Sequence, residues 1–264
     1  MEDEEEPYMA HITYGARPGL KRADTGVRAV ARTFGKAAFI TGGAKSGGAV
    51  VLESAAERLT TQLLHLDPNV RRVSTQPLTV DLVDGVVLYT QEHKKAARAR
   101  HKALGRVSCF YTPDLLAQPS TGVDRVIEVK SEAYPGEENY QLKLQTAESI
   151  LWRHGMEFVQ VVVPGYWRHP LPSNVPLLYQ ASMRQDLAPG TEVLAQIDNL
   201  AHRGACTLGD YCKGLGMDMN MAPVLISGGA LSMDIVEHHI QARTPAAPAY
   251  GSLDHLSVLG RLVV

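Results

Sequence analysis

Two carboxylates and a lysine fall close together near the middle of the sequence. Asp114 follows a proline, and Glu128 and Lys130 lie two positions apart in an otherwise apolar run. Side chains at positions i and i+2 of a strand point to the same face of a sheet, so a strand here would present Glu128 and Lys130 together. Carboxylates that share one site repel each other, and a divalent cation relieves that repulsion. Ligation by oxygen alone favours Mg²⁺ or Mn²⁺.

This set of side chains supplies what phosphodiester hydrolysis requires. A bound metal ion polarises a phosphoryl oxygen and activates a water molecule. Lys130 would stabilise developing negative charge or position the attacking water. The alternative is an ordinary Glu–Lys pair on a solvated sheet face, since such spacings also arise by chance. Val126, Ile127 and Val129 make the strand look buried, which favours the catalytic interpretation.

The surrounding chain predicts an α/β arrangement that would position these residues. Apolar residues recur at helical spacing over residues 53–66, and Asp67-Pro68 would end that helix. Residues 70–88 read as a hairpin with its turn at Asp84-Gly85. We further expect strands over residues 109–116, 125–130 and 158–163, with an amphipathic helix over 141–154. The order is a helix, three or four strands, a helix and a strand, which predicts a mixed sheet flanked by helices.

Three parts of the chain are expected. Residues 1–35 form a weakly ordered segment, residues 36–170 a catalytic domain and residues 171–264 a C-terminal domain. Prolines at positions 170, 172 and 176 mark the second boundary. Short helices are expected over residues 191–202, 207–215 and 219–226, followed by Gly228-Gly229 and a further short element over 231–240, with residues 235–242 also compatible with a helix. Short helices, a glycine turn and a returning strand are typical of a winged-helix domain.

Positive charge is concentrated locally, although the formal net charge is only −2. Lys94, Lys95, Arg98 and Arg100 lie in one basic stretch, and clustered cations favour a phosphate backbone. Lys45 lies in the Gly-rich run of residues 39–51, which lacks the spacing of a phosphate-binding loop. We expect that run to be a flexible loop that touches DNA. The five cations are therefore the candidate DNA-binding residues.

The number and spacing of the cysteines indicate the cellular compartment and argue against a structural zinc site. The three are Cys109, Cys206 and Cys212. An odd and small number argues against a disulfide framework and favours a reducing cytoplasm. Cys206 and Cys212 lack the spacing of a structural zinc site. No run approaches the ~20 apolar residues of a membrane span, and no signal peptide is visible. We expect a cytoplasmic, DNA-associated protein without a membrane segment.

An ordered series of short motifs carries a family resemblance. It comprises Leu-Glu-Ser-Ala-Ala-Glu at residues 52–57, Leu-Asp-Pro-Asn-Val at 66–70, Gln-Pro at 76–77, Tyr-Thr-Pro-Asp at 111–114 and Glu-Val-Lys at 128–130. Over residues 36–163 the chain resembles the PD-(D/E)xK restriction-endonuclease-like superfamily, and more closely the TnsA endonucleases of heteromeric cut-and-paste transposases. Residues 175–243 resemble the winged-helix C-terminal domain of that family, through weaker motifs.

The resemblance implies a role for each residue of the predicted site. Glu57 corresponds to the helix glutamate of the catalytic set, with Glu53, one turn earlier, as the competing choice. Asp114 takes the place of the metal-binding aspartate, Glu128 stands where some members carry glutamine, and Lys130 takes the place of the lysine. The main-chain carbonyl of Val129 is a further metal ligand in the superfamily. The implied ligand set is therefore Glu57, Asp114, Glu128 and Val129, for Mg²⁺ or Mn²⁺, with two ions at the site.

The resemblance also implies a function and partners. Such proteins cleave the 5′ ends of a transposon in double-stranded DNA, while an integrase-like transposase, TnsB, cuts and joins the 3′ ends. An AAA+ regulator, TnsC, binds the nuclease through its C-terminal region. Two alternatives stay open. One is a stand-alone restriction or repair nuclease of the same superfamily, and the other is a non-catalytic DNA-binding adaptor that recruits a transposition regulator.

Overall fold

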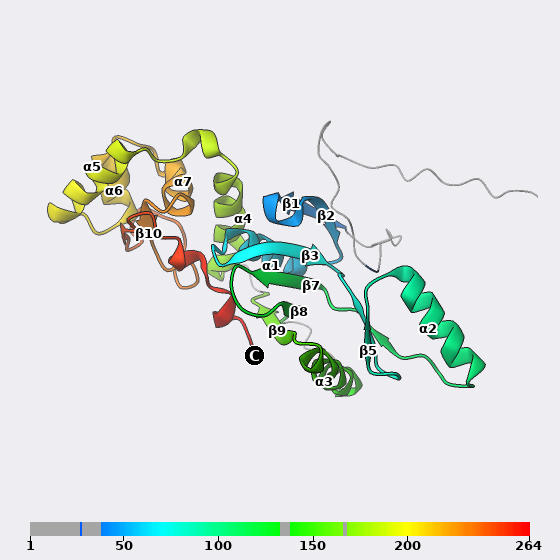
Figure 1. Cartoon of the computed structure of the whole chain (residues 1–264). Helices are drawn as coiled ribbons and strands as arrows, with labels where there is room; N and C mark the ends of the chain where they lie inside the picture. Colours follow the sequence, from blue (N-terminus) through cyan, green and yellow to red (C-terminus); the bar gives the residue numbers. More distant parts are fainter. Residues whose placement is uncertain (1–26, 28–37, 133–137, 166–167) are drawn as a thin grey trace, which may run out of the picture.

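The computed structural model describes residues 27, 38–132, 138–165 and 168–264. The expected weakly ordered segment over residues 1–35 therefore lies outside the described residues except for Val27. The chain is a mixed α/β protein, as predicted. A four-stranded sheet occupies the middle of the molecule, helix α2 projects at one end and helices α5 to α7 lie at the other (Figure 1).

The four-stranded sheet has the strand order β3-β7-β8-β9. These strands span Val70–Thr75, Leu115–Pro119, Arg125–Ser131 and Glu157–Val163. The β3–β7 and β7–β8 pairs are antiparallel, whereas β8 and β9 are parallel and are joined through helix α3, Glu138–Arg153. A crossover helix of this kind is what a parallel pair requires.

Helix α1, Ala55–Leu66, begins and ends where its sequence dictates. The Ser54 hydroxyl accepts a hydrogen bond from the Glu57 N–H at 3.1 Å and so caps the first turn. Pro68 disfavours helical backbone at the residue before it, and Asp67 is accordingly extended. The predicted helix over residues 53–66 is confirmed, with a start two residues later.

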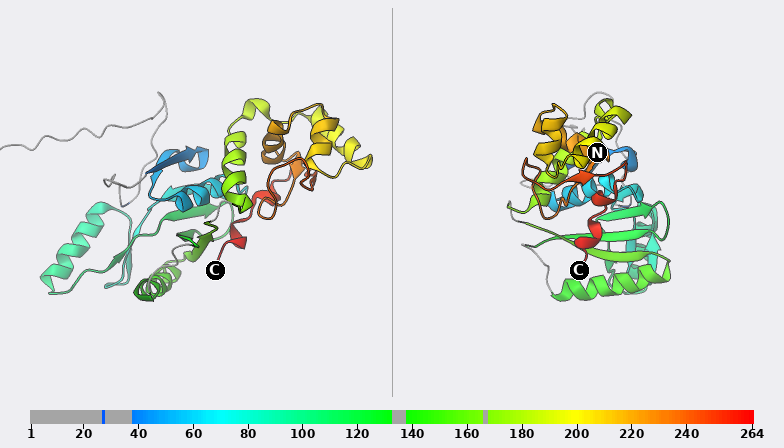
Figure 2. Two further views of the ribbon diagram at one scale, coloured as in Figure 1. Left: turned by 180° about the vertical axis from the view of Figure 1, so that it is seen from behind. Right: turned by 90° about the vertical axis from the view of Figure 1, so that its left-hand side faces the viewer.

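The two faces of the sheet are covered by different helices (Figure 2). Leu63 and Leu64 of α1 share one apolar cluster with Ile127 and Val129 of β8. Val126 of the same strand belongs to a second cluster with Leu144 and other residues of α3. Alternate residues of β8 therefore face opposite helices, as the period of a strand requires.

A second, three-stranded sheet has the order β5-β4-β6. Its strands are Thr79–Asp81 (β4), Val86–Leu88 (β5) and Phe110–Tyr111 (β6). Strands β4 and β5 form a hairpin at the predicted turn, and Gly85 has a φ of 67°, which glycine adopts without strain. Residues 70–75 of the predicted hairpin are instead strand β3 of the other sheet. Helix α2, Gln91–Ala103, follows β5, so the basic stretch is helical.

Residues 109–116 do not form the single strand that we expected. They give β6 in the three-stranded sheet and β7 in the four-stranded sheet, with a break at residues 112–114. Pro113 cannot donate a ladder hydrogen bond, so it ends the pairing of β6. The break leaves Asp114 at the point where the chain crosses from one sheet to the other.

The Gly-rich run is a hairpin and not the flexible loop that we expected. Strands β1, Phe39–Gly43, and β2, Gly48–Leu52, pair antiparallel around a 3₁₀ turn at Ala44–Ser46. A Cβ at Gly42 would approach the Gly48 carbonyl oxygen to 2.2 Å, so the close pairing of these strands requires glycine there. Glycine at this position permits a close strand contact.

The C-terminal part consists mainly of short helices. They are α4 (Pro170–Ser182), α5 (Thr191–His202), α6 (Leu208–Gly214) and α7 (Ala222–Ser227), with 3₁₀ turns at Gln185–Leu187, Met219–Met221, Asp254–Leu256 and Leu259–Arg261. Strands β10, Leu231–Ser232, and β11, Ala247–Pro248, pair antiparallel. Residues 235–242 form turns and bends, so the alternative helix there is wrong.

The predicted boundary near residue 170 falls at the start of α4, which contacts both α1 and α7. Val175 and Leu178 of α4 belong to the same apolar cluster as α1 and the sheet, and that cluster continues to Leu262. The Val162 N–H donates to the Leu262 carbonyl at 2.9 Å, beside strand β9. One apolar core thus runs through both predicted domains. Within the described residues, no helix is long and apolar enough to cross a membrane.

Candidate active site

The structure brings Glu57, Asp114, Glu128 and Lys130 to one region, which we call the acidic centre. Asp114 lies at the break before β7, Glu128 and Lys130 on β8, and Glu57 in the first turn of α1. The Lys130 Nζ lies 2.7 Å from the Glu128 Oε1. The expected pairing of a carboxylate with an ammonium on one face of a strand is therefore present.

Glu128 is buried and fully surrounded by donors. Only 2% of the residue is exposed. The Tyr111 hydroxyl donates to its Oε2 and the Tyr140 hydroxyl to its Oε1, each at 2.7 Å. Lys130 also lies over the Tyr140 ring, 4.3 Å from its centre. Burying a carboxylate is costly unless it is hydrogen-bonded, and these partners meet that requirement.

Neither tyrosine was predicted from the sequence as a site residue. Burial and then the charge of Glu128 raise the pKa of Tyr111 and of Tyr140, so both hydroxyls stay protonated donors. Tyr111 belongs to the Tyr-Thr-Pro-Asp motif, which was a signal that could have found it. Tyr140 had no such signal, because its contact with Glu128 depends on how α3 packs on β8.

Asp114 is held by main-chain groups of its neighbours. Its Oδ2 accepts a hydrogen bond from the Val129 N–H at 2.8 Å, and its carbonyl accepts one from the Gln76 N–H at 2.8 Å. The Asp114 carboxylate thus accepts a hydrogen bond from β8 that a carbonyl of a neighbouring strand would otherwise accept. Val129 enters the acidic centre through its N–H, and the metal-ligand role of its carbonyl stays a prediction.

Negative charge in the acidic centre exceeds the positive charge beside it. Burial raises the pKa of Asp114 well above its usual range, and the charges of Glu128 and Glu57 raise it further. The hydrogen bond from Val129 and the charge of Lys130 act in the opposite direction. Three carboxylates against one ammonium is a charge balance that a divalent cation would correct.

Glu57 and Glu53 differ in their surroundings. Glu57 is buried and accepts hydrogen bonds from the Glu53 N–H at 3.0 Å and from the Ser54 hydroxyl at 2.8 Å. Burial raises the pKa of Glu57, and the charges of Glu53 and Glu128 add to that rise. Glu53 is exposed, and its carboxylate accepts from the Gln76 amide at 3.3 Å. Glu57 is therefore the helix acid whose charge acts on Asp114.

The oxygen donors suit a hard divalent cation, but they do not yet converge. Among the described residues, Asp81, Asp84 and His101 form a group of metal-type side chains whose donor atoms all lie within 4.8 Å of one another. Glu57, Asp114 and Glu128 are not gathered that closely. Because Glu128 is bonded to two tyrosines and a lysine, its carboxylate would have to turn toward Asp114 to share an ion.

Asp81, Asp84 and His101, which we call the Asp–His cluster, lie between the β4–β5 turn and α2. None of the three was predicted from the sequence as a metal ligand. In the sequence, His101 is one polar residue within a basic stretch, although it follows Ala97 at the i+4 spacing of one helix face. Both residues are buried, at 0% and 1% exposed.

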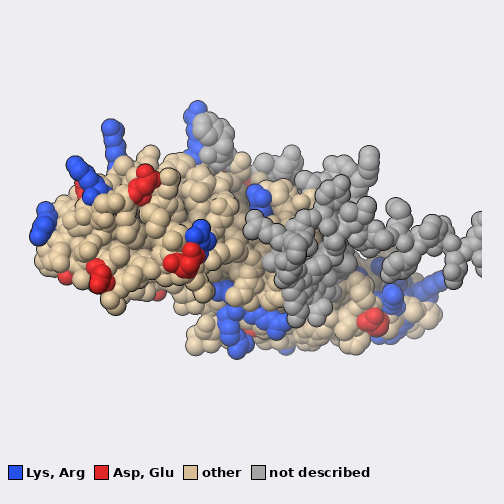
Figure 3. Space-filling model, turned by 90° about the horizontal axis from the view of Figure 1, so that it is seen from above, with Lys and Arg blue, Asp and Glu red and all other residues tan. Residues whose placement is uncertain are grey.

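The candidate DNA-binding cations have unlike surroundings. Lys95 and Arg98 are exposed on α2, and Lys and Arg side chains gather at that end of the molecule (Figure 3). Lys94 donates to the hydroxyls of Thr79 and Thr112 at 3.4 Å, and Thr112 lies two residues before Asp114.

Two more of the five cations are engaged with other parts of the protein. Arg100 is bonded to Asp84. Lys45 donates to the carbonyls of Leu64 and Asp67, where α1 ends. Burial lowers the pKa of Lys45. A role for Lys45 in DNA binding stays a prediction.

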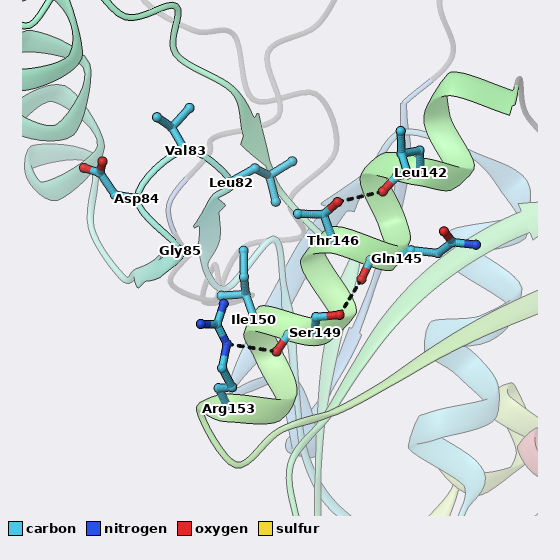
Figure 4. Close-up of a pocket in the computed structure, with 10 residues that line it drawn as sticks. All are labelled: Leu82, Val83, Asp84, Gly85, Leu142, Gln145, Thr146, Ser149, Ile150 and Arg153. Carbon is cyan, nitrogen blue, oxygen red and sulfur yellow. Dashed lines mark hydrogen bonds between the residues drawn. The ribbon is translucent and has the colours of Figure 1, made fainter.

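An open groove lies apart from the acidic centre, between the β4–β5 turn and α3 (Figure 4). Its lining includes Leu82, Gly85 and Ile150. The Thr146 and Ser149 hydroxyls in it donate to carbonyls of their own helix, at 2.9 and 3.0 Å. The groove thus offers no cluster of catalytic groups.

No protein-family model matches this chain, and the comparison with curated proteins gives no match.

Proposed function

We propose that this chain is a metal-dependent DNA endonuclease that cuts at the acidic centre. The observation that carries the proposal is the meeting of Glu57, Asp114, Glu128 and Lys130, which come from three separate places in the fold: helix α1, the break before β7, and strand β8. Burial, together with the charges of Glu128 and Glu57, raises the pKa of Asp114, and a buried carboxylate perturbed in this way is typical of a functional site.

The donor set indicates which groups would hold the ion. Asp114 and Glu128 offer carboxylate oxygens, Glu57 a third, and Mg²⁺ or Mn²⁺ prefers such ligands. When bound, a divalent ion supplies Lewis acidity at the phosphoryl oxygen and lowers the pKa of water. The resemblance implies two ions, which the described geometry leaves untested.

The protein's own residues would prepare the site for the reaction. The Val129 N–H fixes the orientation of the Asp114 carboxylate, and Tyr111 and Tyr140 hold Glu128 in place. The Lys130 ammonium lies beside these carboxylates, where it can stabilise negative charge that develops on a phosphate. The ring of Tyr140 limits the positions that Lys130 adopts.

The motif series further supports a place in the TnsA group of the PD-(D/E)xK superfamily, with a restriction-endonuclease-like catalytic part. The short helices α5 to α7 and the β10–β11 pair are compatible with a winged-helix domain. On this basis we propose cleavage at the 5′ ends of a transposon, alongside a TnsB-type transposase and a TnsC-type regulator.

The experiment that tests this proposal maps nicks on end-labelled transposon-end DNA. The full chain is incubated with Mg²⁺ or Mn²⁺, with and without the cognate transposase. We expect nicks at the 5′ ends that require the ion, the transposase and Asp114. Efficient cutting without any partner would favour a stand-alone nuclease. DNA binding without cutting under any of these conditions would favour the non-catalytic adaptor.

A further inference from the structure

A second group of metal-type donors lies outside the acidic centre. In the Asp–His cluster, the His101 Nε2 lies 3.1 Å from the Asp81 Oδ2 and 3.1 Å from the Asp84 Oδ2. All three atoms lie within 4.8 Å of one another. Ligands at ~2.0–2.1 Å from a tetrahedral ion are separated by about 3.3 Å, so the spacing is close to that of a shared coordination shell.

Two of these donor atoms are buried without a hydrogen bond. Asp81 and His101 are both 0% exposed. Within the described part of the chain, the Asp81 Oδ2 and the His101 Nε2 lie 3.1 Å apart as an ion pair, but neither makes a hydrogen bond of good geometry. Buried polar atoms are nearly always satisfied, so a pair that faces one point without bonding indicates a missing common partner. A cation at that point would satisfy both.

The neighbouring groups hold the donors in position. The Asp81 Oδ1 accepts from the N–H groups of Val83 and Asp84, at 3.0 and 3.3 Å, which directs the other oxygen toward His101. The Ser108 hydroxyl lies 3.1 Å from the His101 Nδ1, and the Phe110 ring stacks on the imidazole. A hydrogen bond on the second ring nitrogen is how proteins orient a metal-binding histidine.

Helix α2 needs an anchor of this kind. Only Ala97 and His101 of its 13 residues are buried, so apolar packing holds it weakly. The helix nevertheless lies against the β4–β5 hairpin. A link from His101 to the two aspartates would fasten the helix at its C-terminal end.

Two arginines lie beside the aspartates, and the Arg100 Nη2 is 3.8 Å from the Asp81 Oδ2 as well as bonded to Asp84. Arg100 bonds to the Asp84 Oδ2 through its Nε at 2.9 Å and also through Nη2, and Arg106 lies 3.6 Å from the Asp84 Oδ1. The Arg100 side chain is 49% exposed and can turn into solvent. An ion at the cluster would therefore have to displace Arg100, and removing this arginine should strengthen binding.

We propose that Asp81, Asp84 and His101 bind a divalent transition-metal ion, of the Zn²⁺ or Mn²⁺ type, that fastens helix α2 to the β4–β5 hairpin. One imidazole nitrogen with two carboxylate oxygens suits these ions better than Mg²⁺. The proposal is independent of the nuclease activity.

The test measures ion binding in the absence of DNA. The full chain, without a histidine tag, is stripped with chelator and titrated with Zn²⁺, Mn²⁺ or Co²⁺ by calorimetry. The Asp114→Asn background removes a ligand of the acidic centre, so that its ion does not obscure the result. We expect one ion per chain, and a rise in melting temperature of roughly 5 °C at about 100-fold excess over the dissociation constant. Co²⁺ should give visible absorption bands.

Variants decide whether the cluster is the site. His101→Gln should abolish binding and the Co²⁺ bands, whereas Arg100→Gln should tighten binding by about tenfold, because it removes a competing charge. His202→Gln is the matched control, since His202 is an exposed helical histidine near Asp198 and should have no effect. Should His101→Gln fail to fold, Asp84→Asn at the edge of the cluster replaces it.

Two results would overturn the proposal. The first is that the chain takes up none of the three ions in the Asp114→Asn background. The second is that His101→Gln or Asp84→Asn binds as well as its parent. A chain that takes up no ion but is destabilised by His101→Gln would show that the cluster is an ion-pair network alone.

Discussion

The acidic centre and the Asp–His cluster both contain buried carboxylates, but they balance their charge differently. In the acidic centre, neutral donors and one ammonium face three carboxylates, and the pKa of Asp114 is well above its usual range. In the Asp–His cluster, two arginines face two aspartates, and hydrogen bonding to Arg100 holds the pKa of Asp84 low.

The difference suggests two kinds of dependence on metal ions. Unbalanced charge in the acidic centre favours a cation strongly, so catalysis there should require one. The Asp–His cluster carries its own counterions, so an ion there would add stability and would leave the chemistry unchanged. Substitutions in the two regions should therefore separate cutting from the anchoring of α2.

The largest expected effect separates the two regions by activity. Asp114→Asn should lower the cleavage rate at least ~100-fold, because it removes the central carboxylate of the ligand set. Lys130→Ala should cost ~10²–10³-fold, since it removes charge stabilisation. Asp84→Asn should cut within about tenfold of the parent. The measurement is the single-turnover rate on transposon-end DNA.

The control for this prediction is Asp186→Asn, which removes an exposed carboxylate paired with Arg184. It should leave the cleavage rate unchanged. If Asp84→Asn lost as much activity as Asp114→Asn, the contrast between the regions would be wrong.

A smaller effect distinguishes the two glutamates of α1. Glu57→Gln should lower the cleavage rate by more than about tenfold, because the charge of Glu57 acts at Asp114. Glu53→Gln should have an effect of only a few fold, since Glu53 is exposed and faces Gln76. The same rate measurement checks both, and the reverse order would place the helix acid at Glu53.

The next effect concerns stability and its dependence on pH. The raised pKa values of Asp114 and Glu57 mean that the folded protein holds these protons more tightly than the unfolded chain. This tighter proton binding stabilises the folded protein. The stabilisation is fully present below the carboxyl pKa of the unfolded chain and is lost as the pH rises through the pKa values of the folded protein. Without divalent ions, Asp114→Asn should raise the melting temperature at neutral pH by a few degrees.

That gain should vanish at pH values below the usual carboxyl pKa, where Asp114 is protonated in both states. The amide oxygen of asparagine can still accept the Val129 N–H, so the local structure is kept. Melting curves across the pH range measure the effect. If Asp114→Asn lowered the melting temperature at neutral pH, the folded protein would not disfavour the charged form of Asp114.

The smallest expected effect concerns the exposed cations of α2. Lys95→Ala and Arg98→Ala should each weaken DNA binding by several fold and reduce the slope of log affinity against log salt by about 1, as for the loss of one phosphate contact. Lys213→Ala, at an exposed residue of α6, is the control and should leave the slope unchanged. Equal slopes for all three variants would place the DNA elsewhere.

Much of the fold could be predicted from local patterns. Apolar spacing and turn residues predict helix α1, the β4–β5 turn at Gly85 and the buried strand β8, and the structure has all three. The break between β6 and β7 was missed, although Pro113 marked it. An apolar run does not reveal that its two halves pair in different sheets.

The site was predictable where strand periodicity applied. Glu128 and Lys130 meet because they lie on one face of β8. The hydrogen bond from Tyr140 and the burial of His101 depend on how α3 and α2 pack on their sheets, which the local sequence does not specify. For Lys45, the sequence shows a basic residue among glycines, but its contacts at the end of α1 depend on the hairpin.

The most direct test of the acidic centre is to locate ions in crystals of the full chain grown with Mn²⁺. The account predicts a peak of anomalous scattering within ligand distance of the Asp114 and Glu128 carboxylates, with Glu128 turned away from Tyr140. Asp114→Asn crystals should lose this peak. A wild-type crystal of an active preparation with Mn²⁺ bound elsewhere and none at Asp114 would contradict the central claim.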